Sequence, residues 1–165
     1  MSAAVARFDS PVGPLTAVVD EQGDLAELSF HGVPPPAGEG GDAAGGPAMK
    51  RVRTELQDYF AGRRRDFSLP LAPRGTVFQR RVWAELCRIP YGATISYREL
   101  AARLGNPAAC RAVARANATN PIAIVIPCHR VIGADGSLTG YGGGLDRKRW
   151  LLEREGALLP MVVAG

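Results

Sequence analysis

The sequence predicts an α+β fold, with a small N-terminal α/β domain containing an antiparallel sheet, followed by a mostly helical C-terminal domain. Short segments rich in apolar and β-branched residues occupy the first thirty positions, and apolar residues recur at helical spacing after Gly75. The composition is that of a globular chain, because 46% of the 165 residues are hydrophobic and 22% are charged. We place the domain boundary after residue 73, so the expected domains are 1–73 and 74–165.

The N-terminal domain begins with three predicted strands that turn-forming residues separate into an antiparallel meander, at residues 5–8, 15–19 and 25–30. Residues 32–47 are almost all Gly, Pro and Ala, so we expect a flexible surface loop there. Apolar side chains at helical spacing then predict a helix over residues 49–60, which stops at Gly62.

The C-terminal domain contains a predicted series of short helices. Thr76 is the expected N-cap of the first, and Ser96 with Glu99 forms the capping-box pattern of the second. Pro107 is expected to begin a third helix that runs to about Ala118. Two short helices joined by a glycine-containing turn are typical of a winged-helix-like helix-turn-helix, in which the second helix contacts DNA. Helix pairs of this kind also occur where the helices only pack together.

The charge is divided unequally along the chain. Residues 1–73 carry 7 Lys and Arg against 10 Asp and Glu, a net charge of −3, whereas residues 74–165 carry 13 against 6, a net charge of +7. This division is typical of a polyanion-binding module beside a scaffold, although an arginine-rich solvated surface would have the same composition. Arginine outnumbers lysine 18 to 2, which favours a GC-rich bacterial source.

The expected compartment is the cytoplasm. No apolar run approaches the ~18 residues of a membrane helix, and the first residues lack the pattern of a secretion signal. Three cysteines at scattered positions do not form a disulfide framework, so we expect a free, reduced thiol. Their spacing from the two histidines gives no zinc-binding pattern, and we expect no metal and no membrane association.

A buried apolar run, residues 122–126, leads directly to Pro127, Cys128 and His129. A thiol beside an imidazole indicates nucleophilic chemistry, because the thiolate is the reactive form and a neighbouring base promotes it. The pairing is accidental in many proteins, since adjacent side chains point apart. The other histidine, His31, lies at the start of the Gly/Pro loop and is expected to be a surface residue.

A catalytic imidazole also needs a partner for its second nitrogen, usually a carboxylate. The predicted last helix, residues 146–155, offers Glu153 and Glu155. The residues alone do not determine which of the two faces the interior.

Three ordered stretches between Phe78 and Gly156 resemble the C-terminal domain of the O6-alkylguanine-DNA alkyltransferases. They are FQRRVWAELCRIPYGATISYRELA, RAVARANATNPIAIVIPCHRVIG and LTGYGGGLDRKRWLLEREG, and the N-terminal DSPVGPLT resembles the family's smaller domain. The resemblance implies a DNA repair protein that flips O6-alkylguanine out of duplex DNA through the minor groove. It would transfer the alkyl group irreversibly and stoichiometrically to its own Cys128, as a monomer and without a cofactor, and whether copies cooperate on DNA stays open.

The resemblance implies catalytic roles for five residues. Cys128 would be the alkyl acceptor, His129 a base acting through water, and Glu155 the carboxylate that orients His129 and helps to raise the thiolate fraction. Asn120 would be the hinge between the DNA-contacting helix and the active-site segment. Tyr97 would help to rotate the nucleotide out and hydrogen-bond the flipped base.

The resemblance also implies a DNA-binding surface and a guanine pocket. Arg111 would enter the duplex and fill the vacated stack, and the other expected DNA contacts are Tyr97, Ala112, Arg115 and Arg130. The expected pocket residues are Val131, Tyr141, Gly142 and Gly143. A nucleotide-phosphate loop is the alternative interpretation of these glycines, but no lysine and Ser/Thr follow in P-loop order. Ala114 and Ala118 stand where many family members have glycine.

Two other function classes compete with a suicide methyltransferase. A non-catalytic lesion sensor would keep the fold but, in the alkyltransferase-like relatives, carries tryptophan at the acceptor position, where this chain has Cys128. A cysteine hydrolase would need an acyl substrate and repeated turnover.

Overall fold

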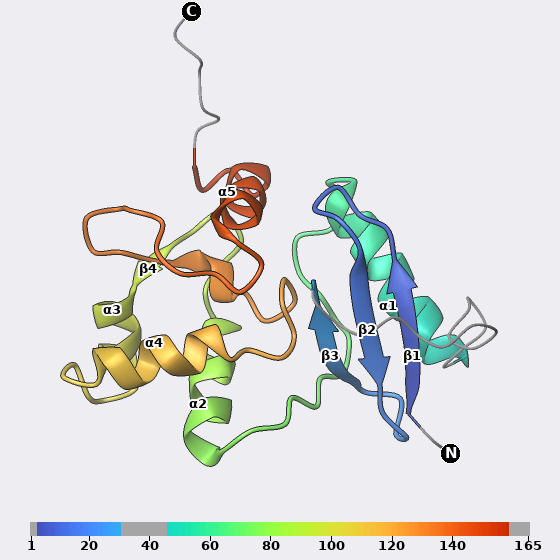
Figure 1. Ribbon diagram of the computed structural model, residues 1–165, viewed down its shortest axis with the longest axis horizontal. Coiled ribbons are helices and arrows are strands. Elements are labelled where there is room, and N and C mark those ends of the chain that lie inside the picture. The colour runs from blue at the N-terminus through green and yellow to red at the C-terminus, as the bar shows by residue number, and fades with distance from the viewer. Residues whose placement is uncertain (1–2, 31–45, 159–165) are drawn as a thin grey trace, which may run out of the picture.

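The computed structural model describes residues 3–30 and 46–158. The N-terminal elements are β1 (Ala4–Phe8), β2 (Leu15–Val19), β3 (Leu25–Ser29) and α1 (Gly46–Phe60). In Figure 1 the three strands form a sheet on one side of the molecule, with α1 beside it and the later helices opposite. The predicted α+β fold class is confirmed.

The sheet is an antiparallel meander in the order β1-β2-β3, as the sequence predicts. Its register pairs Phe8 with Leu15 and Thr16 with Ser29. Alternate apolar residues face the interior, where the stripe of α1 that includes Leu56 and Tyr59 is also buried. α1 begins at Gly46, so the last two residues of the expected loop 32–47 are helical. Pro47 fits there because proline is tolerated in the first turn of a helix. The rest of that loop and His31 lie outside the described residues.

The outer edge of β3 connects the two parts of the chain. The amide of Leu25 donates to the carbonyl of Pro70, and the amide of Leu28 donates to the carbonyl of Pro121, each at 2.9 Å. The amide of Ala123 returns a bond to the carbonyl of Leu28 at 2.9 Å. These bonds satisfy backbone groups that an edge strand would otherwise expose. The two bonds of Leu28 also fix β3 against the segment that leads to Cys128.

The C-terminal elements are α2 (Val77–Leu86), β4 (Ile95–Ser96), α3 (Tyr97–Arg103), α4 (Cys110–Ala118), η1 (Cys128–Arg130), β5 (Val131–Ile132) and α5 (Leu145–Arg154). Thr76 caps α2 in a complete capping box with Gln79, and the Ser96 side chain accepts the Glu99 amide at the start of α3. The predicted start of α4 at Pro107 is wrong. Residues 107–109 form a turn in which the Ala109 amide donates to the carbonyl of Asn106, so the helix begins three residues later.

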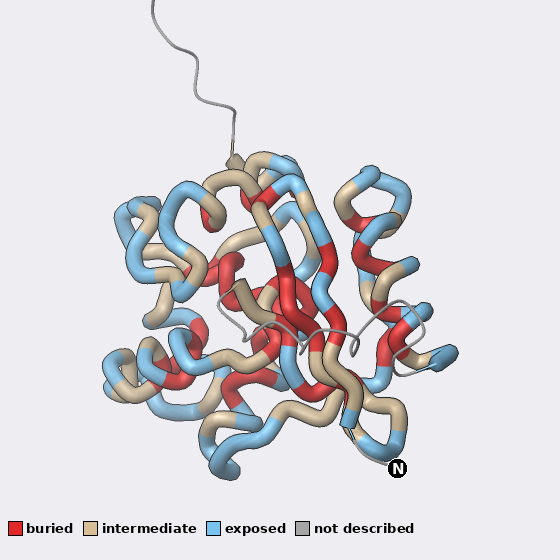
Figure 2. Tube along the Cα trace, turned by 45° about the vertical axis from the view of Figure 1, so that its right-hand side comes forward, coloured by how far each residue is buried: buried red, intermediate tan, exposed pale blue. Residues whose placement is uncertain are grey.

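One apolar core runs through both parts of the chain. Buried residues from the sheet, α1, α2, the 122–126 segment and α5 form a single cluster. Figure 2 shows these buried positions through the middle of the molecule, with exposed positions on the outer turns and helix faces. No helix in the described ranges is both long and apolar enough to cross a membrane.

Candidate active site

The segment before Cys128 is a buried turn rather than a strand. Ile122, Ile124 and Ile126 are each at most 1% exposed, and the Ile126 amide donates to the Ile122 carbonyl at 3.0 Å. Ile124 has φ of 72°, a left-handed conformation that costs a β-branched residue roughly 1–3 kcal/mol. The apolar burial of its neighbours stabilises this turn, which directs the chain inward to Cys128.

Asn120 fastens the same turn with its side chain. Its Oδ1 accepts the Ile122 amide at 3.0 Å, and its Nδ2 donates to the Ile126 carbonyl at 2.7 Å. Asn120 therefore connects the end of α4 to the reactive segment, which is the position expected of a hinge. Burial raises the pKa of the Cys128 thiol, and a hydrogen bond from the Asn120 side chain opposes that rise.

His129 is fully buried, and its Nε2 lies 2.8 Å from Oε2 of Glu155. Burial raises the pKa of Glu155, but hydrogen bonds from His129 and Arg130 outweigh it and lower the value to about 2. An ionised carboxylate only accepts hydrogen bonds, so Nε2 carries the proton of this contact. Burial also lowers the pKa of His129, which favours the neutral ring with a free electron pair on Nδ1. Within the described residues, Nδ1 has no hydrogen-bonding partner.

Cys128 lies at the start of η1, next to His129 in sequence, and is 7% exposed. Burial raises the pKa of its thiol above the ordinary value, although Asn120 and the charge of Lys148 oppose the rise. The raised pKa favours the protonated thiol in the free protein. A reaction at this sulfur needs a base at the moment of attack, and Nδ1 of His129 has the chemistry of one.

Cys128 opens onto a cavity of about 140 Å³. This volume is below the ~300–1,000 Å³ of pockets for drug-sized ligands and suits a smaller group. The hydroxyl of Tyr141 and Oδ1 of Asn117 are buried there without a partner among the described residues, so both are available to a polar ligand. The lining residues are Leu28, Ser29, Phe30, Asn117, Ala118, Asn120, Ala123, Cys128, Gly140, Tyr141, Gly142 and Gly143.

Three of the four expected pocket residues, Tyr141, Gly142 and Gly143, line this cavity, but Val131 does not. Val131 is fully buried, and its carbonyl accepts a hydrogen bond from Nζ of Lys148 at 2.7 Å. The same ammonium donates to the carbonyls of Thr139 at 2.8 Å and Gly140 at 3.3 Å. Lys148 thus holds the glycine-rich loop, residues 133–144, in place. The sequence did not reveal this role, because Lys148 stands among other basic residues of a polar helix.

Arg130 lies in the interior and not on the expected DNA-binding surface. Its side chain is 7% exposed, and Nε and Nη2 donate to the two carboxylate oxygens of Glu155 at 2.7 and 3.0 Å. Nη1 donates to the carbonyl of Ile89 at 2.7 Å. The prediction that Arg130 contacts DNA is wrong, because its guanidinium is directed into the interior.

The remaining expected DNA residues lie around α3 and α4, which Figure 1 places on the side of the molecule away from the sheet. Arg111 and Arg115 are exposed and four residues apart, so they project from one side of α4. Ala112 is partly buried between them. Tyr97 begins α3 and its hydroxyl donates to the Thr139 carbonyl at 3.3 Å. Neither Tyr97 nor Arg111 lines the Cys128 cavity.

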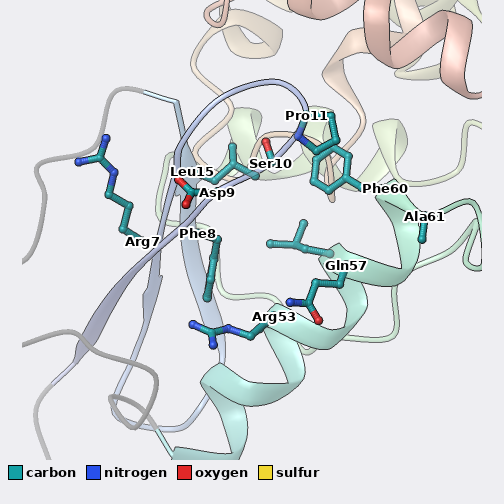
Figure 3. A pocket seen from close by; sticks show the side chains of 11 residues that line it. Arg7, Phe8, Asp9, Ser10, Pro11, Leu15, Arg53, Gln57, Phe60 and Ala61 are labelled. Carbon is teal, nitrogen blue, oxygen red and sulfur yellow. The ribbon is translucent and has the colours of Figure 1, made fainter.

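A second cavity, of about 590 Å³, lies between the end of β1 and α1. Figure 3 shows Arg7 and Phe8 on the strand side and Arg53, Gln57 and Phe60 on the helix side, with the Arg53 guanidinium over the Phe8 ring. Its lining contains no cysteine or histidine, so it lacks the thiol and the neighbouring imidazole that Cys128 and His129 provide. The smaller cavity at Cys128 is therefore the candidate active site.

Known protein families match both parts of the chain. The model of the 6-O-methylguanine DNA methyltransferase DNA-binding domain matches residues 77–157, and that of the same family's ribonuclease-like domain matches residues 5–73. A methylated-DNA–protein-cysteine methyltransferase from Methanosarcina acetivorans is 46% identical over 92% of this chain and 97% of the relative. A Mycobacterium tuberculosis protein of that name is 47% identical over 93% of this chain and 92% of the relative.

Solved structures give the same result. The M. tuberculosis OGT crystallised in complex with DNA superposes with a TM-score of 0.81 at 46% identity, covering 93% of each chain. An M. tuberculosis O6-methylguanine methyltransferase gives a TM-score of 0.79 at 45% identity, covering 96% of this chain and 95% of the other. With both domain models matched and a buried cysteine, histidine and glutamate at its centre, the chain belongs to the 6-O-methylguanine DNA methyltransferase family.

Proposed function

We propose that this protein repairs DNA by moving the alkyl group of O6-alkylguanine onto Sγ of Cys128, once per molecule. The observation that carries the proposal is the geometry around the sulfur. Cys128 faces a small cavity, and the next residue, His129, is held by an ionised carboxylate that leaves Nδ1 free to take a proton. Family membership supports the same chemistry, because the relatives are named for transfer of a methyl group from DNA to a protein cysteine.

The proposed step is a displacement at a saturated carbon. Nδ1 of His129 takes the proton of the thiol, directly or through water, and Sγ forms a bond to the alkyl carbon as the bond from that carbon to O6 breaks. The electron pair of the broken bond stays on the purine, which leaves as a guanine anion. The proton that His129 took from the thiol then neutralises this anion to guanine. The hydroxyl of Tyr141, unpartnered among the described residues, is available to hydrogen-bond the departing base.

The product explains why each molecule should react once. A thioether has no electrophilic carbonyl, so the groups around Cys128 have no means of hydrolysing it. The sulfur stays alkylated and the site is spent. Turnover therefore distinguishes this chemistry from that of a cysteine hydrolase, whose thioester intermediate is hydrolysed in each cycle.

Delivery of the substrate requires DNA to be opened. The target oxygen is stacked and paired inside a duplex, so the nucleotide must rotate out, at a cost of a few kcal/mol. We propose that α4 approaches the minor groove, with Arg115 near phosphate and Arg111 replacing the extruded base. The exposure of both arginines supports this placement, as does the net charge of +7 on residues 74–165.

The direct test is incubation of the purified protein with duplex oligonucleotide containing O6-methylguanine. We expect one methyl group per chain, located on Cys128 by peptide mass spectrometry, and none on Cys128→Ala. Tight binding of the lesion without transfer would indicate a sensor instead. Release of product in excess of protein would indicate a turning-over enzyme. Either result would overturn the proposal.

A further inference from the structure

Tyr59, near the end of α1, brings a hydroxyl from the N-terminal part of the chain to Glu155. The residue is fully buried, and its hydroxyl donates to Oε2 of Glu155 at 2.7 Å across 96 positions of sequence. Its ring packs against those of Phe67 and Tyr91, with centroids 5.4 and 6.3 Å away. Packing of the ring therefore fixes the direction of the hydroxyl.

Oε2 of Glu155 accepts from three donors at once. They are the Tyr59 hydroxyl at 2.7 Å, Nε2 of His129 at 2.8 Å and Nη2 of Arg130 at 3.0 Å, while Oε1 accepts Nε of Arg130 at 2.7 Å. The side chains of His129 and Glu155 are fully buried. Water is excluded from this centre, so the hydrogen bonds to Oε2 influence one another. A strong bond from one donor weakens the attraction of the carboxylate for the proton of another.

We propose that Tyr59 is a positioning residue for alkyl transfer. Its hydroxyl limits how strongly Glu155 attracts a proton onto His129. The inference rests on the proposed function, in which His129 is the base. A base must be neutral before it acts, and a carboxylate 2.8 Å away favours the charged imidazolium. Because the Tyr59 hydroxyl shares Oε2 with Nε2, it weakens that attraction and keeps His129 ready to accept a proton.

The other groups around this centre act in different ways. Arg130 and Lys148 repel a proton on His129 through their charge, and Cys128, the preceding residue in the chain, is the expected proton donor. Tyr141 also lies within electrostatic range of Glu155, and Tyr91 faces Tyr59 but donates to the Arg154 carbonyl at 3.2 Å. Burial and the charge of Glu155 raise the pKa of Tyr59, so its hydroxyl remains a donor throughout the working pH range.

The experiment compares Tyr59→Phe with the unaltered protein in single-turnover alkyl transfer from free O6-benzylguanine, followed across pH. The free base avoids any contribution from DNA opening. Without the hydroxyl, the negative charge on Oε2 attracts a proton onto His129 more strongly, which raises the pKa of His129. The acid limb of the rate should therefore move to higher pH by about half a unit. The rate below that limb then falls about 3-fold, and the rate on the plateau changes little.

Tyr91→Phe is the matched control. It removes a hydroxyl from a neighbouring ring without removing a donor to Glu155, and it should keep the original midpoint. Replacing Tyr59 with 3-fluorotyrosine keeps the ring and makes the hydroxyl a stronger donor. The midpoint should then move to lower pH, which decides the question even if Tyr59→Phe does not fold.

The outcomes are distinguishable. No transfer by the unaltered protein at any pH overturns both the proposed function and this inference. Transfer that slows by the same factor at every pH in Tyr59→Phe, with no movement in the fluorinated protein, assigns Tyr59 a structural role and overturns this inference alone. Opposite movements of the midpoint in the two variants support it.

Discussion

Arg130 and Glu155 form a two-point ion pair in the interior of the protein. Nε and Nη2 of the guanidinium meet Oε1 and Oε2 of the carboxylate at 2.7 and 3.0 Å, and neither side chain is more than 7% exposed. The geometry is the parallel two-bond arrangement in which arginine binds carboxylates best. Glu155 is therefore ionised and fixed in orientation before any substrate arrives.

Removal of this guanidinium should destabilise the fold strongly. Arg130→Leu leaves the Glu155 charge buried without its main partner, and such changes cost about 3–5 kcal/mol. We expect a loss of that size in the free energy of unfolding, measured by urea denaturation. Arg88→Ala is the control, since Arg88 pairs with Glu85 at 3.8 Å with 77% of its side chain exposed. A variant at position 130 as stable as the control would contradict the buried pairing.

Stability should also fall in acid because of Glu155. Its pKa is lowered from 4.5 to about 2 in the folded protein, since hydrogen bonds from His129 and Arg130 overcome the opposing effect of burial. A lowered folded pKa stabilises the fold above the unfolded value, and the stabilisation is lost as pH falls toward the folded value. Between about pH 6 and 2.5 the protein should lose on the order of 3 kcal/mol more than Glu155→Gln, measured by urea titration at each pH. Parallel losses in the two proteins would exclude this assignment.

Lys148 should hold the glycine-rich loop. Lys148→Met removes the donor to the carbonyls of Val131, Thr139 and Gly140 but retains a side chain of similar length. Hydrogen exchange of the loop amides from residue 133 to 144 should accelerate about 10-fold or more, because these contacts are lost to solvent. Lys50→Met, at an exposed position of α1, provides the control and should leave the loop unchanged. Equal protection in both variants would mean that the loop is held by other contacts.

Phe30 should limit the size of the alkyl group. Its ring lines the Cys128 cavity, meets Tyr141 edge-on at 6.0 Å between centroids and lies so close to Gly143 that a Cβ there would be 2.6 Å away. Phe30→Ala should raise the rate with O6-benzylguanine relative to O6-methylguanine at least about 3-fold, since the removed ring leaves space. Phe67→Ala, which alters an aromatic contact of Tyr59 outside the cavity lining, is the comparison. An unchanged ratio of rates in Phe30→Ala would place the limiting wall elsewhere.

Arg111 should matter only when DNA has to be opened. Arg111→Ala is expected to slow repair of duplex O6-methylguanine about 10-fold or more and to leave reaction with free O6-benzylguanine unchanged, because the free base needs no extrusion. Arg80→Ala, another exposed arginine of the C-terminal part, tests whether any lost positive charge has the same effect. Equal losses on duplex and free base would refute the proposed insertion of Arg111 into DNA.

The sequence by itself determined the features that depend on neighbouring residues. Alternating and β-branched segments placed all three strands to within one residue, and the polar residue at position 76 identified the N-cap of α2. Three ordered motif stretches between Phe78 and Gly156 carried the resemblance to the family. These signals are local, because strand alternation, helix capping and short motifs are each written within a few consecutive positions.

Only the tertiary structure decided which polar groups meet in the interior. Arg130 was expected on the DNA surface, yet its carboxylate partner lies 25 positions away and draws it inward. Tyr59 had the spacing of an ordinary core residue, and its contact with Glu155 spans 96 positions. A charged or polar side chain is stable inside a protein only when packing brings it partners, and those partners belong to other elements. The residues alone left Glu153 and Glu155 as alternatives for this reason, whereas the folded chain brings Glu155 to His129.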